Sequence, residues 1–220
     1  MRRAVLPLLL ASLLMACAPS ASGDSGTLPR GEGFDFFVLA LTWSPSYCEI
    51  EGDDANRQQC AEGRELGFVV HGLWPQFESG WPEFCARRGA DRVPRELARR
   101  YLDIMPSVGL MGHQWRKHGA CAGVSQEDYF RLVRAARERI AIPGTYENPA
   151  ADARVSPAAV EAAFLAANPG MKADGIAVAC GGRHLSEIRI CLTKDMEFRS
   201  CPEVDARACR LPQAAMPAPD

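Results

Sequence analysis

The sequence predicts one globular domain that combines strands with helices. Its 220 residues suit a single domain with a substantial core. Hydrophobic residues make up 47% of the chain and charged residues 24%, which is typical of soluble globular proteins. The chain contains both apolar runs of strand length and segments whose apolar residues recur at helical spacing. The formal net charge of -2 gives no overall basic field, so a nucleic-acid partner would need a local basic patch.

The N-terminus predicts export. Arg2 and Arg3 precede a short apolar run that ends near residue 16 and is too short to span a bilayer. The run closes in Leu-Met-Ala-Cys at positions 14–17, which resembles a bacterial lipoprotein cleavage box. We therefore expect a signal peptide over residues 1–16 and a lipid anchor on Cys17; ordinary secretory cleavage, for instance after Ala21, is the alternative. Such a protein would be periplasmic, anchored to the outer membrane of a Gram-negative bacterium, or secreted.

The cysteine count agrees with export. The chain has nine cysteines, and removing Cys17 leaves an even set. In an oxidising compartment, eight cysteines most simply form four disulfides. A zinc site is a weaker alternative, because the chain has no close C-x-x-C pair.

Apolar runs predict four strands, and the composition before and after them predicts a flexible segment at each end of the domain. The strands are expected at 34–43, 66–70, 176–180 and 185–192. Residues 17–32 are rich in Ser, Gly and Pro and predict a flexible tether. Residues 213–220 are rich in Pro and Ala and predict a frayed tail, so the folded domain is expected over residues 33–212.

Three segments predict helices outside the central motif. The first, 94–104, has Pro in its first turn; its arginines Arg95, Arg99 and Arg100 could contact phosphates, although a solvated charged face is more typical. Ser125, with Asp128 three residues later, predicts the start of a helix that ends before 143–144. A further helix is expected from residue 156 to 168. Residues 48–64 predict a surface loop, and 105–112 a turn.

Two segments carry candidate chemistry. The strand at 66–70 runs into His71-Gly-Leu-Trp-Pro75, which places His71 at a predicted strand end; a half-buried structural histidine is the alternative. The segment His113-Gln-Trp-Arg-Lys-His-Gly-Ala-Cys121 predicts a short helix ended by Gly119. On such a helix His113, Gln114, Lys117 and His118 share one face. Two imidazoles, an ammonium and an amide suit an anionic substrate that must lose and regain a proton, such as a phosphodiester.

Both segments resemble the two active-site signatures of the ribonuclease T2 family. Residues 41–48 also resemble its first core strand, and 185–191 a late strand followed by Cys201-Pro202. The resemblance spans residues 34–209. It implies an α+β fold in which helices pack on an antiparallel sheet. It also implies cleavage of single-stranded RNA without metal or cofactor, and we expect the chain to act as a monomer.

The resemblance implies a role for each signature residue. The RNA 2′-hydroxyl attacks the adjacent phosphorus and expels the 5′-oxygen, leaving a 2′,3′-cyclic phosphate that is later hydrolysed to a 3′-phosphate. By position, the implied catalytic residues are His118 as base, His71 as acid, Lys117 as the cation that stabilises the phosphoryl oxygens, His113 as a phosphate contact, and Gln114. The implied substrate-binding residues are Trp74, which would stack on a base, and Gln76.

Four disulfides are expected. A bond between Cys48 and Cys60 would close the polar loop. The resemblance implies that Cys85–Cys121 braces the second signature and that Cys180–Cys209 and Cys191–Cys201 staple the C-terminal strands.

One position departs from the family. Gln114 stands where the family usually has Glu, and an amide can donate a hydrogen bond but cannot titrate at neutral pH. We expect activity to survive, because both catalytic imidazoles and Lys117 remain. A catalytically weakened protein that binds RNA or another partner is the alternative. A metal-dependent hydrolase is disfavoured, because the sequence lacks clustered carboxylates.

Overall fold

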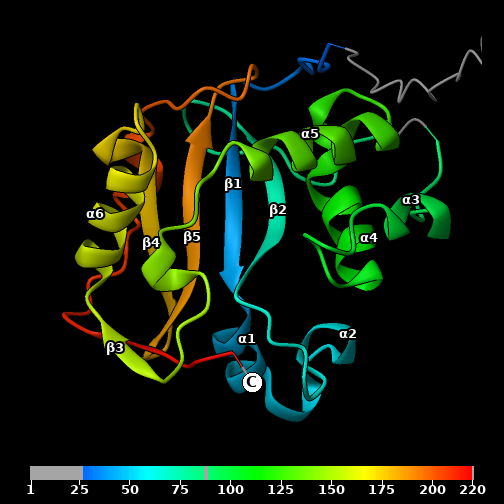
Figure 1. The fold of residues 1–220 in the computed structure, drawn as a ribbon. Coiled ribbons are helices and arrows are strands. Elements are labelled where there is room, and N and C mark those ends of the chain that lie inside the picture. Colours follow the sequence, from blue (N-terminus) through cyan, green and yellow to red (C-terminus); the bar gives the residue numbers. More distant parts are fainter. Residues whose placement is uncertain (1–26, 87–88, 220) are drawn as a thin grey trace, which may run out of the picture.

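The computed structural model describes residues 27–86 and 89–219, which form an α+β domain as predicted (Figure 1). The strands are β1 (Phe36–Trp43), β2 (Phe68–Gln76), β3 (Ala153–Val155), β4 (Ile176–Gly181), β5 (His184–Leu192) and β6 (Ala214–Met216). The helices are α1 (Ser44–Glu51), α2 (Arg57–Cys60), α3 (Arg95–Arg99), α4 (Val108–Lys117), α5 (Gln126–Glu138), α6 (Pro157–Ala167) and α7 (Pro202–Asp205). Short 3-10 turns lie at Gly52–Asp54, Gly119–Ala122, Gly144–Tyr146 and Ala173–Gly175.

Four antiparallel strands in the order β2-β1-β5-β4 make the body of the sheet. Strand β6 extends it by one parallel bridge to β5 and pairs with β3. In the central strand, Leu39 lies opposite Leu73 of β2 and Ile190 of β5, and all three are buried. Alternate residues of a strand point to opposite faces, so this register assigns one face of β1, β2 and β5 to the core.

Helices cover the core face. Helix α5 packs on β1 and β2, and α6 packs on β4. In Figure 1, α6 lies at the left and α5 further to the right. Ser125 caps α5 as predicted: its Oγ accepts a hydrogen bond from the Asp128 amide at 3.1 Å. The α5 side chains Tyr129 and Phe130 and the α6 side chain Phe164 are fully buried. This packing leaves the other face of β2, β1 and β5 available for polar groups.

Helix α4 begins earlier than the sequence pattern indicated. The predicted turn at 105–112 already contains its first turns, because the Ser107 side chain accepts a hydrogen bond from the Leu110 amide at 3.2 Å. The α-helix ends at Lys117, and Gly119 opens a 3-10 turn instead of ending the helix. A Cβ on Gly119 would lie 2.8 Å from Trp115 and Tyr129, so the glycine is needed for close packing.

Other boundaries also differ from the predictions. Strand β2 continues to Gln76, beyond the expected end at 70. The expected loop at 48–64 contains part of α1 and all of α2, and the Asn56 side chain accepts a hydrogen bond from the Gln58 amide at the start of α2. The expected helix at 94–104 is limited to Arg95–Arg99.

Both predicted flexible ends require correction. The predicted frayed tail, 213–220, forms β6, where Ala214 and Met216 are buried, and the Pro217 carbonyl accepts a hydrogen bond from Trp43 Nε1 at 2.8 Å. The last part of the predicted tether is docked, because the Glu32 amide donates to the Ala122 carbonyl at 3.1 Å. The predicted signal peptide and Cys17 lie outside the described residues.

All four expected disulfides are present: Cys48–Cys60, Cys85–Cys121, Cys180–Cys209 and Cys191–Cys201. Four such bonds indicate a protein that matures in an oxidising compartment after export. Among the helices of the described residues, none has the length and apolar character needed to cross a membrane.

The buried tail predicts a stability effect. Met216 is 1% exposed, so Met216→Ala should lower the free energy of unfolding by about 2–5 kcal/mol through lost burial and a residual cavity. The exposed neighbouring variant Gln213→Ala should change it by less than about 0.5 kcal/mol. Urea unfolding of both variants measures the difference, and equal stabilities would show that β6 does not contribute to the core.

Candidate active site

A cavity of about 370 Å³ lies on the face of β2 that is turned away from the core, between β2, β5, α4 and α7. All seven predicted catalytic and substrate-binding residues line it: His71, Trp74, Gln76, His113, Gln114, Lys117 and His118. Three charged or aromatic residues without a predicted role also line it: Trp81, Arg189 and Arg207. The structure therefore brings the two signatures together on a single hollow.

His71 reaches this cavity through a β-bulge. On β1, Leu41 pairs with Val70 and the next residue, Ala40, pairs with Gly72, so His71 has no partner in the ladder. In a regular strand residues three apart point to opposite faces. The extra residue cancels that alternation and places both His71 and Trp74 on the cavity side, while Val70 and Leu73 remain in the core. The prediction that His71 ends its strand is therefore wrong, since it lies inside β2.

Gly72 lets helix α4 approach β2. A Cβ at this position would overlap Gln114 Oε1, so any other residue would push the helix away from the strand. At this contact Trp74 Nε1 donates a hydrogen bond to Gln114 Oε1 at 2.8 Å, and Gln114 is 1% exposed. The predicted helical face is present, because His113, Gln114, Lys117 and His118 all line the cavity. The residues between them point elsewhere: Arg116 lines a different hollow, and Trp115 is buried against Tyr129.

His118 is held uncharged. Its imidazole is buried at the end of α4, with its ring centroid 5.4 Å from that of Trp74. Burial, followed by the positive charge of Lys117 and the two other histidines of the cavity, lowers the pKa of His118 to about 3. Its Nδ1 atom is buried and has no hydrogen-bond partner. A neutral imidazole can accept a proton at any pH above this value.

His113 and Lys117 lie on the more open side of the cavity. Partial burial and then the charges of Lys117 and Arg116 lower the pKa of His113. The Lys117 ammonium lies 3.7 Å from a carboxylate oxygen of Glu83, and the Phe84 amide donates to the Lys117 carbonyl at 2.8 Å. The Cys85–Cys121 disulfide fastens this same loop to the end of α4.

Glu187 was not predicted as a site residue, yet it is the partner of His71. One of its carboxylate oxygens forms a short hydrogen bond with Nδ1 of His71, and the other accepts two hydrogen bonds from Arg189, at 3.0 and 3.1 Å. Burial alone would raise the pKa of Glu187, but the contacts with His71 and Arg189 outweigh it and lower the pKa to about 2. Glu187 is therefore ionised throughout the pH range of folded proteins.

The sequence holds no local signal for this role. Glu187 and Arg189 alternate with the buried Ile188 and Ile190 along β5, which is also the pattern of a strand with one solvated face. Only the pairing of β5 with β1, where Glu187 lies opposite Thr42, brings the carboxylate beside His71.

The remaining cavity residues are aromatic or amide groups. Trp74 has His71 at its edge, with ring centroids 5.4 Å apart, and the Arg189 guanidinium 5.6 Å from its centroid. Gln76 is mostly buried and donates a hydrogen bond to the Pro75 carbonyl at 2.9 Å. Trp81 is 45% exposed, with Arg207 over its ring at 5.0 Å. Trp81 thus exposes part of its ring at the mouth of the cavity, beside Arg207.

The cavity combines acid–base groups with a site for an anion. It contains an uncharged imidazole, a second imidazole paired with a carboxylate, and an ammonium. In residues 27–86 and 89–219, no three His, Cys, Asp or Glu side chains are grouped so that they could hold a metal ion.

Comparisons with known proteins agree with this chemistry. The model of the Ribonuclease T2 family matches residues 34–201. A ribonuclease of Aeromonas hydrophila is 35% identical over 182 residues, which cover 81% of this chain and 78% of the relative. An RNase-related protein from Calystegia sepium has a similar fold, with a TM-score of 0.66 and 22% identity, covering 86% of this chain and 100% of that one. A mutant of RNase MC1 in complex with 5'-UMP gives a TM-score of 0.58 at 22% identity, over 76% and 92% of the two chains.

The family match over residues 34–201 includes both signatures and the strands β2 and β5 beside the cavity, and the relative from Aeromonas matches 81% of the chain. This chain therefore belongs to the ribonuclease T2 family and is an endoribonuclease of that type.

Proposed function

We propose that the chain cleaves single-stranded RNA by transesterification, in which the 2′-hydroxyl attacks the adjacent phosphorus and the 5′-oxygen leaves. The products are a 2′,3′-cyclic phosphate end and a free 5′-hydroxyl, and the cyclic phosphate is later hydrolysed to a 3′-phosphate. The observation that supports this proposal is the contrast between two imidazoles beside one indole. His118 is buried and neutral, whereas His71 is paired with an ionised carboxylate.

His118 is the base in this proposal. Its pKa of about 3 keeps it neutral at the pH of an RNA digest, so it can take the proton of the 2′-hydroxyl as the P–O bond forms. The burial that keeps the imidazole neutral also limits competing hydrogen bonds from water. DNA lacks the 2′-hydroxyl and is not a substrate.

His71 is the acid. With Nδ1 bound to Glu187, the other ring nitrogen is free to hold the proton that the leaving 5′-oxygen needs. The ionised carboxylate stabilises the positive imidazolium, as the buried aspartate of a serine-protease triad does. Glu187 is therefore a positioning residue that acts through His71.

Lys117 and His113 contact the phosphoryl group in this proposal. Charge accumulates on the phosphoryl oxygens as the nucleophile adds, and an ammonium at that place stabilises it. Lys117 would exchange its 3.7 Å pair with Glu83 for the phosphate. Gln114 holds Trp74 through its side-chain oxygen and keeps its amide group at the cavity wall.

Trp74, Gln76 and Trp81 form the part of the cavity where a base would bind. Stacking of a base on an aromatic ring contributes about 1–3 kcal/mol. The 5'-UMP bound by the RNase MC1 mutant supports a nucleotide as occupant of this cavity.

Export by a lipoprotein signal, with a lipid on Cys17, stays a prediction. The mass of the mature N-terminal peptide will decide it.

The proposal is tested by an RNA digest with chelator present. Wild type should yield 2′,3′-cyclic phosphate ends, and His71→Ala and His118→Ala should each lower kcat by about 10²–10⁴-fold, the usual contribution of a general acid or base. His184→Ala is the matched control, because His184 pairs with Glu49 at 2.9 Å and does not line the cavity. Binding of RNA without turnover by wild type would support the weakened binding protein, and loss of activity in chelator would support a metal-dependent enzyme.

Restoring the family's carboxylate should change the pH profile. In Gln114→Glu, a negative charge in the same cavity raises the pKa of His118 from about 3. The base is then protonated at higher pH, so the acid limb of kcat/KM should move upward by about one pH unit. Gln114→Met loses the acceptor for Trp74 Nε1 and adds no charge, and should leave that limb in place. Identical profiles for the Glu and Met variants would contradict the assignment of His118 as base.

Removing the charge of Glu187 should lower turnover more than substrate binding. Glu187→Gln keeps the shape of the side chain but no longer places a carboxylate on Nδ1 of His71, so kcat should fall about 10²-fold while KM changes little. Glu49→Gln breaks the other His–carboxylate pair, outside the cavity, and should behave as wild type. A rise in KM with kcat unchanged would contradict this positioning role of Glu187.

A further inference from the structure

A second hollow, of about 620 Å³, lies along another side of α4. Three arginines line it, Arg92, Arg95 and Arg116, and two glycines of α4, Gly109 and Gly112, belong to its wall. We call it the arginine groove. Among the residues that the structure describes, none with an acidic side chain lines the groove.

The three arginines of the groove differ from the other arginines nearby. On α3 and α5, Arg99 binds Glu96 at 2.9 Å, Arg100 binds Glu127 at 2.8 Å, and Arg134 binds Asp103 at 2.7 Å. These arginines are already paired with carboxylates. For the arginines of the groove, no ion pair is formed with any residue of the described ranges. Within residues 27–86 and 89–219, these three guanidinium groups are therefore not paired with a carboxylate, on a chain whose net charge is -2.

A third hollow lies next to both the arginine groove and the active-site cavity. That hollow, of about 270 Å³, shares His71 and His113 with the cavity and Gly109 with the groove. The three hollows therefore follow one another around α4. Such a series fits a linear molecule that extends away from the reacting bond.

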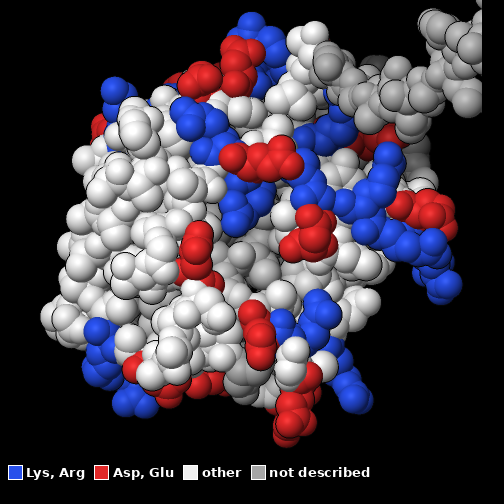
Figure 2. Space-filling view, viewed as in Figure 1, with Lys and Arg blue, Asp and Glu red and all other residues white. Residues whose placement is uncertain are grey.

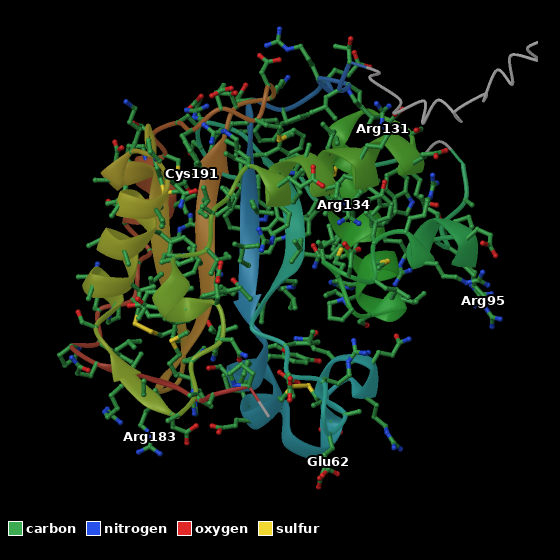
Figure 3. All side chains as sticks on the ribbon, in the orientation of Figure 1. Glu62, Arg95, Arg131, Arg134, Arg183 and Cys191 are labelled. Atoms are coloured by element: carbon green, nitrogen blue, oxygen red, sulfur yellow. A yellow bond between two sulfur atoms is a disulfide. The ribbon has the colours of Figure 1, made fainter. Side chains whose placement is uncertain are left out.

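The charge distribution fits a polyanion. In Figure 2, Lys and Arg side chains lie on the right of the molecule, over the region where Figure 1 draws α3 and α5, with the Asp and Glu side chains of the ion pairs among them. Figure 3 shows Arg95 projecting outward from α3, whereas Arg183 lies on the opposite side of the same view. Arg92 and Arg95 are exposed, and Arg116 is partly buried, so their guanidinium groups remain accessible. A guanidinium binds a phosphate through two parallel hydrogen bonds.

We propose that the arginine groove binds backbone phosphates of the RNA strand at a distance from the scissile bond. This inference rests on the proposed function for the identity of the polymer. The contacts are to phosphate, so they add affinity for long strands without selecting a base. A dinucleotide occupies the active-site cavity alone and does not reach the groove.

The test measures binding of 2′-O-methyl RNA, which lacks the nucleophile and is not cut. In the triple variant Arg92→Gln, Arg95→Gln, Arg116→Gln, the affinity for a long strand should fall about tenfold, and the slope of log K against log salt should decrease by about 2, because each lost phosphate contact contributes about 0.7. The affinity for a dinucleotide should stay within about twofold of wild type. The matched control replaces Arg154, Arg183 and Arg210, which are exposed, do not line these hollows and change the net charge equally.

Three results would overturn the proposal that the arginine groove binds phosphates. These are unchanged affinity for the long strand, the same loss of affinity in the control triple variant, or an equal loss of affinity for the dinucleotide. Cleavage of an unmodified dinucleotide by wild type is measured in parallel. If wild type does not cleave it, the proposed function fails, while the binding comparison still decides whether the groove holds phosphates.

Discussion

The single extra residue in β2 sets the geometry on which the site depends. Without the bulge at His71, the alternation of the strand would send His71 and Trp74 to opposite faces of the sheet. With it, both reach the cavity while Leu73 remains in the core. The disruption of one ladder pair is confined to the edge strand β2, whose other pairs to β1 are regular. The surrounding sheet can therefore hold an irregular catalytic segment rigidly.

The two imidazoles acquire different properties from different elements. Helix α4 buries His118 beside Lys117, and both effects favour its neutral form. Strand β5 supplies Glu187, whose ionised carboxylate is bonded to Nδ1 of His71. Neither residue type nor spacing distinguishes the two histidines, whereas their surroundings do. The contact between Gln114 and Trp74 then keeps the helix and the strand at a fixed separation, so that both environments face one space.

The sequence predicted what depends on local pattern. Helix α5 and its Ser125 cap, the main strands and the shared face of α4 follow from periodicity and capping, and the two signatures identified the cavity residues. What it missed depends on pairing between distant segments. The bulge at His71 is visible only in the register with β1, and Glu187 only through the pairing of β5. Strand β6 was missed because its Ala-Ala-Met sequence has low strand propensity, so the strand depends on its pairing with β3 and β5.

The hydrogen bond from Trp43 to the Pro217 carbonyl joins the end of the first strand to the last segment of the described chain, 174 residues later. Trp43 is completely buried, and its indole N–H has this carbonyl as its partner. An unpaired buried N–H costs about 1–3 kcal/mol. The central sheet therefore reaches its final stability only after the chain through Pro217 has been synthesised. Until then, the indole N–H at the end of the first strand lacks the carbonyl that pairs with it in the folded domain.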